Sequence, residues 1–144
     1  MPIAQTNYVI AYFSLGIVLL ALAIFVYSRA RDSVHKLFSA YSFAISWWSL
    51  FTIPMITATN HQMGYFWDQV CLTGAIFIPP TFFHFVLLFI DQARKFKKII
   101  TSCYLISIFF LVVNFLGAFV SDVQPYRAFN FYTIPSLFYN VFVF

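Results

Sequence analysis

Residues 70–90 read VCLTGAIFIPPTFFHFVLLFI, and this stretch decides the fold. It contains no Asp, Glu, Lys or Arg, and its length matches the roughly 20 apolar residues that a helix needs to cross the hydrocarbon core of a bilayer. Three other runs have the same character: residues 8–28, 37–59 and 99–120. The pattern predicts an all-α fold, a polytopic transmembrane helical bundle with four full spans.

The composition supports a membrane environment. Hydrophobic residues make up 62% of the 144 and charged residues only 8%, whereas soluble domains carry about 25% charged residues. A soluble domain of this size could not hide so much apolar surface. We therefore expect the lipid bilayer to be its main partner. The basic residues sit in two short clusters between apolar runs, which argues against nucleic-acid binding.

These basic clusters also predict the orientation. Residues 29–36 carry three Lys or Arg and residues 91–98 carry four, whereas residues 60–69 and the segment before Tyr8 carry none. Cytoplasmic loops are enriched in Lys and Arg. We expect a multi-pass protein of the cell inner (plasma) membrane, with its N-terminus and the 60–69 loop on the non-cytoplasmic side.

The last part of the chain departs from this pattern. Residues 121–133 are polar and aromatic, and from residue 134 the chain is apolar again for about half a span. We interpret residues 1–144 as a single transmembrane domain that includes the start of a fifth helix, and we expect a fragment of a longer protein. The alternative is an interfacial aromatic tail.

Two adjacent prolines mark the middle of the third run. Pro79 and Pro80 lack N–H groups, so the carbonyls of Ala75 and Ile76 lose their helical partners and need others. We expect the helix to bend here. The bend could make room for a ligand, act as a hinge, or simply be part of the helix shape, and the residues alone leave these readings open.

Four further side chains are candidates for a ligand or hinge site. His84 is ionisable within an apolar run, which points to function, although a neutral His can equally bond a neighbouring helix. Trp47 and Trp48 lie mid-span, where they form an aromatic wall or simply pack. Asn114 is expected to make an interhelical hydrogen bond.

The second run carries a stripe of small hydroxyl residues at helical spacing: Ser39, Ser42, Ser46, Ser49 and Thr52. Small residues let helices approach closely in lipid. We interpret the stripe as a packing seam, with a polar pocket lining as the alternative.

At these positions the chain resembles a known family. GAIFIPPTFFHFVLLFI, with the mid-span Trp residues and the basic turns, is similar to the N-terminal seven-helix sensor region of bacterial histidine kinases. The matching positions are Gly74, Ala75, Ile78, Pro79, Phe83, His84 and Phe85. Ser136 stands where the family usually has a Gly. The resemblance implies a sensory input module whose cytoplasmic output domain is missing from this chain.

We therefore expect a signal-input module of a histidine-kinase-type, two-component signalling protein. It would respond to a small apolar or membrane-borne ligand, and a homodimer is left open. The alternative is a small four-helix transporter or channel, which generally needs a carboxylate within its spans; none lies within the four runs. A membrane enzyme is disfavoured, because the sequence offers no catalytic residues, no metal-ligand set and no cofactor site.

Overall fold

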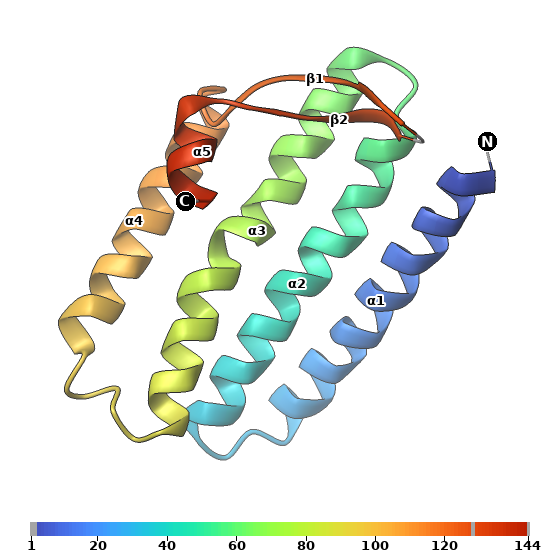
Figure 1. The fold of residues 1–144 in the computed structure, drawn as a ribbon. Coiled ribbons are helices and arrows are strands. Elements are labelled where there is room, and N and C mark those ends of the chain that lie inside the picture. Colours follow the sequence, from blue (N-terminus) through green and yellow to red (C-terminus); the bar gives the residue numbers. More distant parts are fainter. Residues whose placement is uncertain (1–2, 128, 144) are drawn as a thin grey trace.

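The computed structural model describes residues 3–127 and 129–143 and shows four long helices followed by a hairpin and a short helix (Figure 1). The long helices are α1 (Ile3–Ser28), α2 (Ser33–Thr57), α3 (His61–Phe89) and α4 (Lys97–Phe115). Strands β1 (Val120–Tyr126) and β2 (Phe129–Pro135) form an antiparallel pair, and α5 (Leu137–Val143) follows.

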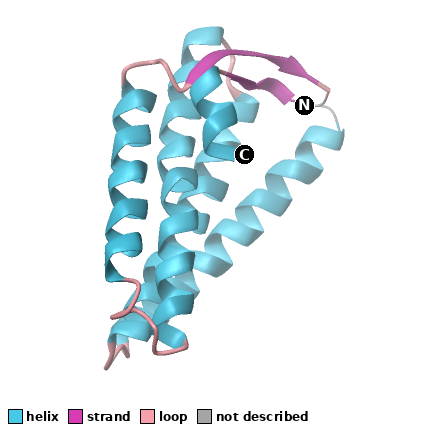
Figure 2. Cartoon of the chain, turned by 60° about the vertical axis from the view of Figure 1, so that its left-hand side comes forward, coloured by secondary structure: helices cyan, strands magenta, loops and turns pink. Residues whose placement is uncertain are grey.

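The long helices lie side by side in chain order, each packed against the next. The β1–β2 hairpin crosses the end of the bundle at which the N-terminus lies, and it contacts α2 and α3 there (Figure 2). From the hairpin, α5 turns back along α4. Tyr139 and Phe142 of α5 pack against Phe119, and Phe142 also packs against Phe110 of α4.

Short polar signals set the ends of the helices. Asp32 caps α2 by accepting the backbone N–H of His35, and Asn60 caps α3 by accepting that of Met63. Gly117, with φ +75°, follows the end of α4, a conformation that favours glycine. The turn allows the chain to leave the helix and enter β1.

The serine stripe is a packing seam, as expected. Ser39 donates to the carbonyl of Ala23 and Ser46 to that of Gly16, each at 2.7 Å, so both hydroxyls join α2 to α1. All members of the stripe are buried. The hydroxyls of Ser39 and Ser46 therefore serve helix association, whereas Thr52, at the end of the stripe, lines a small cavity described below.

Three helices in the described part of the chain are long and apolar enough to cross a bilayer: α1, α3 and α4. Large apolar side chains on their outer faces are exposed, among them Phe25 and Leu105, as expected for surfaces that contact lipid. The expected span over 37–59 is not confirmed on these criteria, although α2 packs between α1 and α3.

The structure corrects several expectations. The fold is mostly helical but not all-α, because residues 120–135 form the hairpin. The fourth helix ends at Phe115 rather than at 120, and α5 begins at Leu137 rather than 134. The expected loop 60–69 is helical from His61 onward, so α3 begins well before residue 70. The side chain of Asn60, which accepts the backbone N–H of Met63, is the local signal for this earlier start.

Candidate functional site

The proline pair lies inside an uninterrupted α3. Pro79 is exposed and Pro80 is buried. The carbonyl of Ile76, which Pro80 deprives of its helical partner, accepts a hydrogen bond from Ser107 of α4 at 3.2 Å. The expectation that a neighbouring helix satisfies this carbonyl is confirmed. The hydroxyl of Thr81 donates to the carbonyl of Phe77 at 2.6 Å, which adds a second polar contact beside the prolines.

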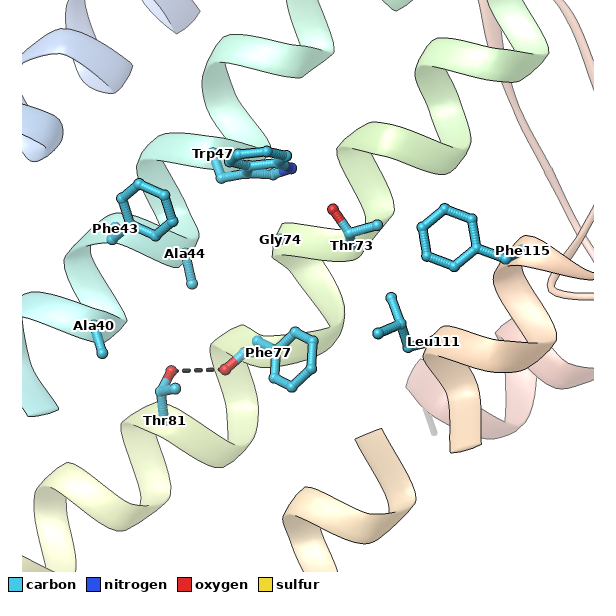
Figure 3. A pocket seen from close by; sticks show the side chains of 10 residues that line it. All are labelled: Ala40, Phe43, Ala44, Trp47, Thr73, Gly74, Phe77, Thr81, Leu111 and Phe115. Atoms are coloured by element: carbon cyan, nitrogen blue, oxygen red, sulfur yellow. Dashed lines mark hydrogen bonds between the residues drawn. The ribbon is translucent and has the colours of Figure 1, made fainter. Parts of the chain in front are cut away.

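A groove of about 540 Å³ runs along the face of α3 between α2 and α4 (Figure 3). Its lining is almost wholly apolar and comes from all three helices: Ala40, Phe43, Ala44, Trp47, Thr73, Gly74, Phe77, Thr81, Leu111 and Phe115. Phe77 and Thr81 place the groove directly beside the proline pair. It therefore combines an apolar hollow with the segment where helical hydrogen bonding is weakest.

Gly74 forms the floor of this groove and brings α2 and α3 together. A Cβ atom at this position would lie 2.8 Å from the carbonyl oxygen of Ala44, from Cδ1 of Trp47 and from the backbone nitrogen of Trp48. Only glycine permits so close an approach of the two backbones. The indole of Trp47 is fixed by a 2.9 Å hydrogen bond to the carbonyl of Val70 and packs on Phe51.

Trp48 faces a different hollow from its neighbour Trp47. It lines a small enclosed cavity of about 80 Å³ beneath the hairpin, together with Tyr12, Asp68 and Cys71. The rings of Tyr12 and Trp48 meet edge to face, 6.0 Å apart. The two tryptophans thus line two separate hollows, and Trp47 is the one that contributes an aromatic ring to the groove.

Asn114 and His84 both join α3 to α4. The Asn114 amide donates to the carbonyl of Gln69, and the Gln69 amide donates to the carbonyl of Asn114, each at 2.8 Å. This confirms the expected interhelical bond. His84 lies 3.3 Å from the hydroxyl of Tyr104 through Nδ1. Neither residue lines the groove.

Asp68 is the functional candidate that sequence reasoning missed. It is only 1% exposed and sits inside α3, so the premise that the spans hold no carboxylate was incomplete. We had assigned it to an outer loop. A signal was available, because Asp68, Cys71 and Leu72 are spaced three and four residues apart and share one helix face.

A hydrogen-bonded contact joins the first residue of α3 to strand β1 of the hairpin. Nε2 of His61 lies 2.6 Å from Oδ1 of Asp122. The backbone N–H of Val123 and the imidazole of His61 hold the pKa of Asp122 below its ordinary value. Within the described residues, no group of three or more His, Cys, Asp or Glu side chains could hold a metal ion.

These features define the chain as a membrane-embedded helical protein with an apolar groove on its central helices. The family model for the N-terminal 7TM region of histidine kinase matches residues 11–143, and the chain belongs to this family. The matched region is the sensory part of such kinases and not their catalytic part. No curated protein and no solved structure matched the chain in the corresponding searches.

Proposed function

We propose that this chain is a ligand-responsive input module, and that the groove between α2, α3 and α4 binds a small apolar or membrane-borne ligand. The observation that carries the proposal is the position of the groove. It is lined by Phe77 and Thr81, which flank the proline pair of α3. A pocket of several hundred Å³ with an apolar lining and few polar groups is typical of small-molecule sites.

Pro79 and Pro80 act as the movable element in this proposal. The carbonyl of Ile76 depends on Ser107 of α4 instead of its own helix. A change in α3 at this point therefore alters its contact with α4. A ligand that fits one arrangement of the helices better shifts the population toward it. His84 lies between the prolines and the basic turn, against Tyr104, where it would transmit such a shift.

The same proposal includes the topology. The N-terminus lies on the non-cytoplasmic side of the inner membrane, and the basic turns face the cytoplasm. Helix α2 also crosses the membrane, between α1 and α3, and brings the number of spans to four. The basic turns lie at the end of the bundle opposite the N-terminus (Figure 1). A cytoplasmic output domain, with a homodimer as its working form, would receive the signal. Accessibility of single cysteines introduced at residues 6 and 94 to a membrane-impermeant thiol reagent in whole cells tests the orientation.

Quenching of Trp47 tests the groove directly. The chain with Trp48→Phe and Trp67→Phe retains only the groove tryptophan and is placed in lipid nanodiscs. We expect 9,10-dibromostearate to quench it saturably and excess stearate to reverse the quenching. Ala40→Phe fills the groove and should abolish the saturable part, whereas Ala21→Phe on the outer face of α1 should not. Fluorescence quenching that rises in proportion to the concentration of dibromostearate, equally in Ala40→Phe and Ala21→Phe, would argue against a binding site in the groove.

The hinge is tested in the full-length kinase. Replacing Pro79 and Pro80 together by Ala restores two backbone N–H groups and should change autophosphorylation more than Cys103→Ala does. Equal effects of the two changes would rule out the prolines as the movable element.

A further inference from the structure

A second hollow lies beneath the hairpin and shares no lining residue with the groove. Its centre is the carboxyl group of Asp68, which is 1% exposed. One oxygen, Oδ1, accepts a hydrogen bond from Thr133 of β2 at 2.8 Å. The other, Oδ2, is buried and has no hydrogen-bond partner among the described residues. No salt bridge to Asp68 is present in the same part of the chain.

The cavity beside Asp68 is rich in aromatic rings. Its volume is about 80 Å³, and its lining contains Tyr12, Trp48, Tyr132 and Tyr139, contributed by α1, α2, β2 and α5. The other lining residues are Thr52, Met55, Cys71, Leu72 and Thr133, so no Lys, Arg or His reaches it. A buried carboxylate needs a compensating positive charge or a proton. Aromatic faces attract cations in addition.

The size of the cavity restricts the ligand. A buried water needs about 10–15 Å³ measured in this way. The cavity therefore has room for roughly five to eight atoms of the size of a water molecule, which is enough for a small alkylammonium ion and less than the nine heavy atoms of tetraethylammonium.

A neighbouring hollow borders the cavity. A larger hollow of about 420 Å³ shares Tyr12 and Tyr132 with the cavity and is otherwise lined by Ala4, Tyr8, Tyr126, Arg127 and Phe129. Arg127 is exposed and lies over the ring of Tyr126. Its repulsion of an approaching cation is screened by solvent and salt. The two tyrosines thus line both the larger hollow and the cavity, and they stand where we expect a cation to approach Asp68.

We propose that the Asp68 cavity binds a small primary ammonium ion, whose N–H groups donate to Oδ2 and whose alkyl carbon packs against the aromatic lining. The hairpin supplies Tyr132 and Thr133, and α5 supplies Tyr139. Binding therefore stabilises the packing of the hairpin and α5 against α3. This site shares no lining residue with the apolar groove, so the proposal does not rest on the function proposed for the groove.

Binding of radiolabelled methylammonium to the 144-residue chain in nanodiscs at pH 7.5 tests the proposal. We expect saturable binding with one site per chain, competed by ethylammonium but not by tetraethylammonium or sodium at the same ionic strength. Asp68→Asn should lower the affinity about tenfold or more, because it removes a charged hydrogen-bond partner. Asp91→Asn is the matched control, since Asp91 is exposed at φ 55°, where Asn is well tolerated.

Far-UV circular dichroism establishes that each variant retains its helices. Asp68→Glu keeps the charge but moves the carboxylate by one methylene into the small cavity, and it should also weaken binding. The proposal is overturned if the wild-type chain shows no saturable binding, if Asp68→Asn binds as well as wild type, or if sodium and tetraethylammonium compete equally. Absence of binding in a fully helical wild-type chain would mean that a proton neutralises Asp68 instead.

Discussion

Replacement of Gly74 by Ala should destabilise the bundle more than the same replacement at Gly16. At Gly74 the new Cβ would lie 2.8 Å from three atoms, and two of them are backbone atoms of Ala44 and Trp48. Ordinary van der Waals contact of a Cβ atom begins at 3.4 Å, about 0.6 Å farther away. The backbones of α2 and α3 must therefore separate by an amount of that order. At Gly16 the new Cβ would lie 2.6 Å from Cγ and Cδ2 of Leu50, which belong to a side chain that can rotate away.

The expected changes in the free energy of unfolding follow from whether the obstructing atoms belong to the backbone or to a side chain. Overpacking a well-packed interior costs about 1–3 kcal/mol, and the immobile backbone atoms place Gly74→Ala toward the upper end. Alanine recovers roughly 0.5–1 kcal/mol of helix propensity at either position. We therefore expect a net loss of about 2 kcal/mol for Gly74→Ala and a change within about 1 kcal/mol for Gly16→Ala.

Reversible unfolding by SDS in mixed micelles, followed by far-UV circular dichroism, measures both free energies of unfolding. The new Cβ lies closer to its nearest neighbour at Gly16, 2.6 Å, than at Gly74, 2.8 Å. If distance alone decided the cost, Gly16→Ala would be the more destabilising replacement. If Gly16→Ala proves as costly as Gly74→Ala, the identity of the obstructing atoms does not decide the outcome and the reasoning fails.

Two further predictions concern polar groups. Ser107→Ala leaves the carbonyl freed by the proline pair without its partner and should cost about 1–2 kcal/mol, whereas Ser102→Ala, at an exposed hydroxyl that bonds only its own helix, should cost under about 0.5 kcal/mol in the same unfolding assay. Because the pKa of Asp122 is lowered, first by the backbone N–H of Val123 and then by His61, its contribution to stability is present above the ordinary carboxyl pKa of about 4 and is lost as the pH falls through the lowered value. Thermal unfolding of wild type and Asp122→Asn between about pH 6 and pH 2 should therefore converge at the acidic end, and a constant difference across that range would contradict the assignment.

Much of the bundle was predictable because its cause is local. The apolar runs identified four helices in their correct order, and the need of the Ile76 carbonyl for a partner on a neighbouring helix followed from the missing N–H of Pro80. Asn114 in an apolar run required an interhelical partner, which proved to be Gln69. In both cases the chemistry of a single residue type, a proline without an N–H or an amide in an apolar run, required a hydrogen-bond partner on a neighbouring helix.

The hairpin and the Asp68 cavity were not predictable in the same way. β1 and β2 depend on packing against α2 and α3, which are distant in sequence. The polar residues 61–69 resembled a loop because their buried partners, such as Thr133 and the hairpin side chains, come from the far end of the chain. Only the folded arrangement shows that Asp68 is covered.

Trp47 and Trp48 show why the two hollows are mechanically linked. They are neighbours in α2, yet one lines the groove and the other lines the Asp68 cavity. Trp47 is bonded to α3 through the carbonyl of Val70, and the carbonyl of Trp48 accepts from Cys71 of α3 at 3.4 Å. The close contact at Gly74 lies between the same two helices. Any sliding of α3 against α2 must therefore change both hollows together, so a ligand that stabilises one shape of either hollow biases the same helix arrangement.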